Sequence, residues 1–237
     1  ALQEAPTLGI HNLTHEITPY NIFEASYRLF QTVEYWPQGT TFVSVVDPGV
    51  GSDRKSVVAL TSRNQYIVTP DNGTLSYIKK HVGIKAVREI SEIENRRRNT
   101  ELSYTFHGRD VYAFTGAKLA SDHISFEEVG PELAIESIVE LPVVETVIED
   151  NLVRGAVDIL DVRFGSLWTS ITREEFYTLK PEFNNRFEVT IYNNDMLVYQ
   201  NQVTYGKSFA AVRIGQPIIY INSLYRVGVA INQGSFA

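Results

Sequence analysis

The feature that most constrains the fold is a change of pattern part-way along the chain. In the first half, strand-like runs alternate with helix-like segments, which is typical of an α/β layer with a largely parallel sheet. In the second half, short strand-like runs recur between turns, which predicts a small antiparallel barrel or sandwich. An acidic segment over 126–151, with Pro131 and Pro142, resembles an inter-domain connection. We therefore predict an α/β domain over 1–135 and an all-β barrel, with the connection, over 136–237.

Individual elements follow from local signals. Asn21 and Glu24 have the spacing of a capping box, so we expect a helix over 22–36, and Pro37 ends it. A second helix is expected over 108–119 from its apolar spacing. The expected strands cover 41–46, 56–61, 66–69, 155–160, 187–192, 196–199, 217–221 and 227–231.

Charge and composition exclude several classes of function. The 21 basic and 28 acidic residues give a net charge of −7, so we expect neither nucleic acid nor an anionic membrane as partner. The absence of cysteine excludes disulfides, thiolate catalysis and cysteine-ligated zinc. No apolar stretch reaches the length of a membrane span, and the sequence begins without a signal-peptide pattern. We expect a cytoplasmic protein.

No metal site is expected. His11 and His15 are four residues apart, but Pro19 follows closely and the segment does not look helical, so the two rings need not share a face. Three successive arginines, Arg96 to Arg98, follow acidic residues and are interpreted as a solvated loop.

Two motifs are the main candidates for chemistry. Asp47 to Gly51 lies where a predicted buried strand ends, which is where open α/β sheets place ligand sites, and Arg54 follows within reach. The alternative is a structural turn. Thr105 to Asp110 opens a predicted helix, whose unpaired N–H groups suit a polar ligand, and it contains His107. The alternative there is a helix cap with a satisfied histidine.

Together these motifs resemble the S-adenosylmethionine hydroxide adenosyltransferase family, the relatives of the fluorinase and chlorinase enzymes. The resemblance runs in order along nearly the whole chain. The segments that carry it are Thr14–Ile17 with Pro19, Val45–Gly51 with Arg54, Pro70–Gly73, Thr105–Asp110, Asp161 with Phe164–Gly165, and Asn222–Ser223.

The resemblance implies an α/β domain, a β-barrel domain and a homotrimer with active sites between subunits. The implied reaction cleaves S-adenosylmethionine with water or hydroxide at C5′, giving adenosine and L-methionine. The family's catalytic triad corresponds to Asp47, Arg54 and His107. The halogenating branch has other residue types there, so the full triad favours hydrolysis. The sulfonium leaves as a neutral thioether, which needs neither a metal nor a cofactor.

The resemblance also assigns substrate contacts. Tyr20 corresponds to an aromatic position against the ribose and sulfonium, where an aromatic face is favourable for a cation, and the pair Thr105–Phe106 corresponds to another wall of the pocket. Asp161 and Ser223 correspond to positions that hold the methionine amino and carboxylate groups. The remaining implied contacts are Trp168 near the adenosyl group, Ser166, and the backbone of Ile231 to Gln233 at the adenine.

The sequence departs from the family pattern at two places. Ser166 stands where the family motif has asparagine, and no aspartate occurs before Asp47. Either the family's first strand, with its ribose-binding aspartate, is missing here, or the lineage has lost this binding group. These departures leave open a non-catalytic module that binds adenosine or S-adenosylmethionine. A halogenase that uses S-adenosylmethionine is the other alternative to hydrolysis.

Overall fold

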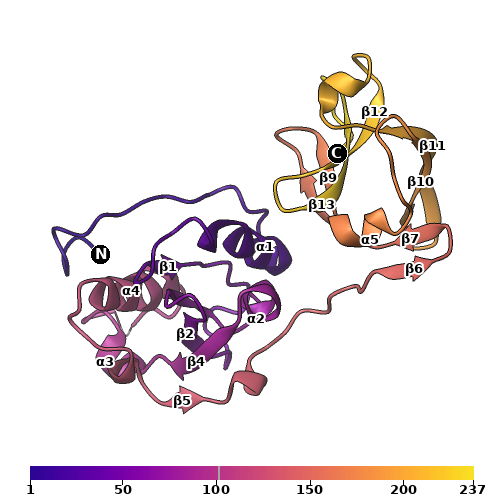
Figure 1. Ribbon diagram of the computed structural model, residues 1–237. Coiled ribbons are helices and arrows are strands. Elements are labelled where there is room, and N and C mark those ends of the chain that lie inside the picture. The colour runs from indigo at the N-terminus through magenta and orange to yellow at the C-terminus, as the bar shows by residue number, and fades with distance from the viewer. Residues whose placement is uncertain (101) are drawn as a thin grey trace. The chain divides into compact units, whose positions relative to one another are not determined.

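The chain divides into two compact units, Ala1–Pro142 and Val143–Ala237, in a computed structural model that describes residues 1–100 and 102–237. Figure 1 shows their elements along the chain. The division falls at Pro142, within the acidic segment in which the sequence predicted a connection.

A five-stranded sheet in the order β1-β3-β2-β4-β5 forms the centre of the first unit. Its strands are β1 (Thr41–Val43), β2 (Ser56–Thr61), β3 (Tyr66–Pro70), β4 (Ile84–Glu89) and β5 (Glu132–Leu133). Of the described pairs, β1 with β3 is parallel and the others are antiparallel, so the expectation of a largely parallel sheet is wrong. The reason is chain length: the residues between Thr61 and Tyr66 suffice for a hairpin, whereas a parallel return needs a dozen or more.

Helices cover both faces of this sheet. They are α1 (Ile22–Val33), α2 (Ser76–His81), α3 (Glu92–Asn95), a π-helical turn (Gly108–Tyr112) that leads into α4 (Ala113–Ala120), and short 3-10 turns at Glu127–Val129 and Ile135–Ser137. Side chains of β2 point alternately to the two faces, as a strand requires. Val57 packs with residues of α1 and α2, while Val58 belongs to the cluster of Tyr112 and of Leu119 from α4.

The beginning of α1 follows the sequence prediction in part. The Asn21 side chain accepts a hydrogen bond from the Glu24 backbone N–H at 2.9 Å and caps the helix. The Glu24 carboxylate accepts from Thr18 N–H instead of the cap residue's own N–H, so the reciprocal half of the capping box is absent.

The second unit contains a curled six-stranded sheet in the order β10-β11-β12-β13-β9-β8. Its elements are β8 (Val157–Asp161), β9 (Ser166–Thr172), α5 (Arg173–Tyr177), β10 (Arg186–Asn193), β11 (Met196–Tyr205), a 3-10 turn (Phe209–Ala211), β12 (Pro217–Ile221) and β13 (Arg226–Ile231). A separate hairpin joins β6 (Val147–Glu149) to β7 (Leu152–Arg154).

This sheet is a half-barrel, not the closed all-β barrel that the sequence predicted. No described pair joins β10 to β8, and α5 adds a helix. The β10–β11 hairpin meets β12 only over the register pairs of Thr204 and Tyr205, and its far end is exposed.

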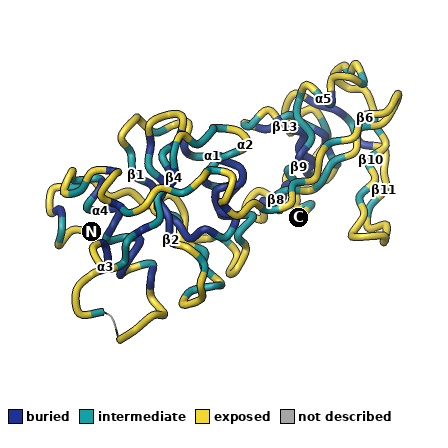
Figure 2. Tube along the Cα trace, turned by 90° about the horizontal axis from the view of Figure 1, so that it is seen from below, coloured by how far each residue is buried: buried dark blue, intermediate teal, exposed yellow. Residues whose placement is uncertain are grey.

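Buried residues concentrate at the centre of each unit (Figure 2). In the second unit the core includes Leu167, Phe176 and Val229, contributed by β9, α5 and β13. Among the helices in the described part of the chain, none has the length and apolarity that crossing a membrane requires.

Candidate active site

The loop between β1 and β2 brings Asp47 and Arg54 together. Arg54 Nε donates to Asp47 Oδ1 at 2.8 Å, and Arg54 Nη2 donates to Asp47 Oδ2 at 2.5 Å. The Asp47 side chain is 6 % exposed and the Arg54 side chain is 10 % exposed. Asn72 fixes the start of the loop, because its Nδ2 donates to the Val46 carbonyl at 2.9 Å. The pairing is the two-point geometry in which a guanidinium binds a carboxylate most strongly.

His107 joins this pair at the start of the π-helical turn. Its Nδ1 lies 3.0 Å from Arg54 Nη2, and the imidazole is 5 % exposed. An arginine N–H can only donate, so Nδ1 accepts and the neutral ring carries its proton on Nε2. Burial lowers the pKa of His107 most, Arg54 and Arg96 lower it further, and the carboxylates of Glu92 and Asp47 oppose them. His107 is therefore neutral at pH 7, and its buried Nε2 has no partner among the described residues.

The buried hydroxyls of Ser56 and Tyr112 form hydrogen bonds with the Asp47–Arg54 pair. Arg54 Nη1 donates to Ser56 Oγ at 2.9 Å, and Ser56 Oγ donates to the Tyr112 hydroxyl at 3.1 Å. The Tyr112 hydroxyl in turn donates to Asp47 Oδ2 at 3.4 Å. Burial raises the pKa of Tyr112 far above its ordinary value, so the phenol stays protonated. Neither Ser56 nor Tyr112 was predicted from the sequence as part of the site.

A second ion pair lies behind His107. Arg96 Nη1 donates to Glu92 Oε2 at 2.7 Å, and Glu92 Oε1 lies 4.0 Å from His107 Nδ1. Arg96 also donates to the carbonyls of Thr100 and Ser103, at 3.2 and 2.8 Å. The interpretation of Arg96 as part of a solvated loop is therefore wrong, because its side chain is 6 % exposed and holds the segment before His107.

The other predicted residues of the first unit lie at its surface. Thr105 and Phe106 are exposed immediately before His107, and the Arg109 guanidinium stacks over the Phe106 ring at 4.6 Å. Tyr20 is 78 % exposed, and no described contact links it to Asp47 or His107.

The second unit contains a hollow of about 530 Å³ at the residues predicted to contact adenine. Its lining consists of residues 162–165, Phe209 and residues 231–235, which include Ile231 and Gln233. Gly165 has φ +63°, and a Cβ there would lie 2.5 Å from the Ser235 Cα, so a side chain does not fit. The volume is in the range of small-molecule sites.

The remaining predicted residues of this unit lie on neighbouring elements. Asp161 and Ser166 are register partners of β8 and β9, both are buried, and Ser166 Oγ has no partner among the described residues. Trp168 Nε1 donates to the Tyr220 hydroxyl at 3.2 Å, and Ser223 is exposed in the turn after β12. Asp161, Ser166, Trp168 and Ser223 are outside the lining of the hollow.

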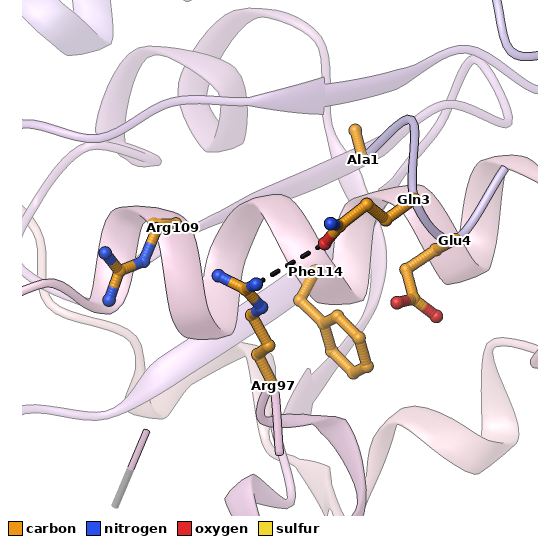
Figure 3. A pocket seen from close by; sticks show the side chains of 6 residues that line it. All are labelled: Ala1, Gln3, Glu4, Arg97, Arg109 and Phe114. Carbon is orange, nitrogen blue, oxygen red and sulfur yellow. Dashed lines mark hydrogen bonds between the residues drawn. The ribbon is translucent and has the colours of Figure 1, made fainter. Parts of the chain in front are cut away.

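A smaller cavity lies in the first unit (Figure 3). Ala1, Gln3 and Glu4 line it opposite Arg97, Arg109 and Phe114. Arg97 Nη2 donates to Gln3 Oε1 at 3.4 Å across it. Its volume of about 60 Å³ is too small for a nucleoside, and none of the predicted site residues lines it. Among the described residues, no three histidine or acidic side chains are placed to hold a metal ion.

The model of the SAM hydroxide adenosyltransferase N-terminal domain matches residues 1–130, and that of the C-terminal domain matches residues 155–237. The chain belongs to the SAM hydroxide adenosyltransferase family.

Individual relatives agree with this membership. An (R)-S-adenosyl-L-methionine hydrolase from Thermus thermophilus is 31 % identical over 98 % of this chain and 84 % of that protein. One from Methanocaldococcus jannaschii is 43 % identical, over 46 % of this chain and 40 % of that protein. A fluorinase from Actinopolyspora mzabensis is 25 % identical over 95 % of this chain and 81 % of that protein. The crystal structure of an uncharacterized conserved protein from Thermotoga maritima has a TM-score of 0.89 and 32 % identity, covering 99 % and 85 % of the chains.

Proposed function

We propose that this protein is an S-adenosyl-L-methionine hydrolase, which transfers the 5′-deoxyadenosyl group to water and releases adenosine and L-methionine. The observation that carries the proposal is the Arg54 guanidinium, which bridges Asp47 and the buried imidazole of His107. The family membership and the names of the relatives support the same reaction.

The chemistry needs a positioned and reactive oxygen nucleophile. The sulfur of the substrate is already cationic, so methionine leaves as a neutral thioether without a general acid. A cation such as Arg54 favours hydroxide over water by lowering the pKa of a nearby water, and Asp47 and His107 can orient the oxygen and accept its proton. Holding the oxygen in line with the C5′–S bond supplies several kcal/mol more.

Substrate binding is assigned to residues of both units. The hollow at Ile231 and Gln233 has the size for an adenine-bearing ligand, and the buried Ser166 hydroxyl lies on the strand next to it. Phe106 offers an aromatic face beside His107 for the sulfonium. The remaining proposed contacts are Asp161, Ser223, Trp168, Tyr20 and Thr105.

We also propose the domains, the oligomeric state and the cellular location of the enzyme. The domains of the proposed enzyme are an α/β domain over 1–135 and a β domain over 136–237. Its active form is a cytoplasmic homotrimer with active sites between subunits and no metal cofactor. Sedimentation equilibrium tests the assembly, since a monomer or dimer that retains full turnover contradicts the trimer.

The test is incubation of the full chain with S-adenosylmethionine in H₂¹⁸O, followed by chromatography and mass spectrometry. The expected products are methionine and adenosine with ¹⁸O in the 5′-hydroxyl, because attack occurs at C5′. The relatives' names specify the (R) form, so the two sulfonium epimers are tested separately, and we expect the (R) epimer to be consumed faster.

Matched variants connect the products to the site. Asp47→Asn and His107→Asn should lose turnover, whereas Asp53→Asn and His123→Asn, which change exposed residues of the same types, should not. Added chloride or fluoride that yields 5′-halo-adenosine would indicate the halogenase. Calorimetric binding of S-adenosylmethionine that persists unchanged for hours in folded protein would indicate the binding module.

A further inference from the structure

The Nδ1 atom of His107 has two neighbours of opposite character. Arg54 Nη2 at 3.0 Å can only donate a hydrogen bond to it, and Glu92 Oε1 at 4.0 Å can only accept one when ionised. The neutral ring with its proton on Nε2 uses Arg54. A ring with a proton on Nδ1 is repelled by Arg54, and Glu92 is the acceptor beside it.

The Glu92 carboxylate is held in this orientation. Arg96 Nη1 binds its Oε2 at 2.7 Å, which leaves Oε1 on the side of His107. Arg96 is itself fixed by the carbonyls of Thr100 and Ser103. The charged groups that face the imidazole are therefore Arg54 and Asp47 from the loop before β2, and Glu92 and Arg96 from α3 and the residue that follows it.

We propose, building on the proposed function, that Glu92 is a positioning residue for His107. Its carboxylate, 4.0 Å from Nδ1, stabilises a proton on that atom by charge and so makes Nε2, the buried ring nitrogen without a described partner, the base of the reaction. This requires the ring proton to shift from Nε2, where Arg54 places it in the ligand-free chain, to Nδ1.

Water supplies both the nucleophilic oxygen and the proton that His107 receives. The water oxygen forms the bond to C5′, and the electron pair of the C5′–S bond leaves with the methionine sulfur. The water proton moves to Nε2 of His107, and the cationic ring keeps its Nδ1–H beside the Glu92 carboxylate. His107 then releases the proton to solvent, while Arg54 stays paired with Asp47.

Glu92→Gln tests the proposal, because the amide oxygen still accepts from Arg96 but the charge is lost. We expect kcat to fall at least about fivefold, the factor for one opposite charge lost at about 4 Å under water-like screening. KM should change less than about twofold, because Glu92 acts on the transition state through His107. The acid limb of the kcat–pH profile should move to lower pH, because the imidazolium loses a stabilising charge.

Two matched variants separate this role from a structural one. Glu94→Gln makes the same charge change on the same helix at an exposed position and should leave kcat and the profile unchanged. Glu92→Asp keeps the charge and should return the acid limb toward its wild-type position. A fall in kcat for Glu92→Gln with an unmoved acid limb would indicate a structural role and overturn the proposal.

A measurement that does not depend on turnover completes the test. The ring nitrogens of His107 are followed by ¹⁵N NMR through a pH titration of the full chain and assigned by their loss in His107→Gln. The pKa of His107 should be lower in Glu92→Gln than in wild type and unchanged in Glu94→Gln. Equal pKa values in Glu92→Gln and wild type refute the pairing. If the wild-type protein does not cleave S-adenosylmethionine, the proposed function is wrong. The NMR titration still tests whether Glu92 and His107 interact.

Discussion

Replacing Arg54 by glutamine should destabilise the first unit strongly. The Asp47 carboxylate is 6 % exposed and receives both of its short hydrogen bonds from Arg54. Removing one partner of such a pair leaves a buried charge without compensation, which costs about 3–5 kcal/mol. The His107 Nδ1 and Ser56 Oγ contacts are lost as well. We expect the free energy of unfolding to fall by about 3 kcal/mol, since a glutamine amide restores one hydrogen bond of about 1 kcal/mol.

The assay is urea denaturation followed by tryptophan fluorescence. Each unit has one of the two tryptophans, Trp36 in the first and Trp168 in the second, so a Trp168→Phe background reports the first unit alone. A double-mutant cycle with Asp47→Asn isolates the pair. Asp47→Asn should recover part of the stability lost in Arg54→Gln, because the unpaired charge is removed.

Two results would refute this reasoning. An unchanged unfolding midpoint in Arg54→Gln would mean that Asp47 is solvated in the folded state. Additive effects of the two substitutions would mean that the side chains do not interact. The exposed Arg63→Gln serves as the control for removal of a guanidinium, and it should change the free energy of unfolding by less than about 0.5 kcal/mol.

Three further predictions concern other parts of the molecule. Burial lowers the pKa of His107, so the unfolded state binds more protons than the folded state. The contribution of His107 to stability should therefore be complete above the unfolded pKa of 6.5 and decline as the pH falls below it. The free energy of unfolding, measured by denaturation at pH 5 and pH 8, should differ less between the two pH values in His107→Gln than in wild type. Tyr112→Phe should cost about 1 kcal/mol of stability by denaturation and lower kcat, because the phenol no longer donates to Asp47. Gly165→Ala should weaken substrate binding by calorimetry more than Gly215→Ala, because both have positive φ but a Cβ meets backbone only at Gly165.

The sequence predicts the parts of the site that are close along the chain. Asp47 and Arg54 are within one loop, and the end of a buried strand places that loop correctly. His107 begins the predicted helix, and its association with the pair rests on the family resemblance. Ser56, Tyr112 and Glu92 could not be assigned, because each reaches the cluster only through tertiary packing of generic residue types.

The sequence pattern also did not determine the direction of the strands or whether the second sheet closes into a barrel. A β-branched run such as 56–61 predicts a strand equally well in either direction, so the parallel sheet was an inference from the alternation of helices and strands. The four-residue connection to the next strand was the signal that favours a hairpin. β9 (Ser166–Thr172) was not among the expected strands, and Gly165 directly before it is a turn signal.

The π-helical turn at Gly108–Tyr112 sets the relative orientation of two site residues. Its wide turn is closed by a hydrogen bond from Ala113 N–H to the Gly108 carbonyl, five residues back; His107 precedes it and Tyr112 is its last residue. If the same residues closed into an α-helix, one end would rotate against the other by about 100°, the angle of one residue. The wide turn therefore keeps the imidazole and the phenol in the orientation in which they flank the Asp47–Arg54 pair.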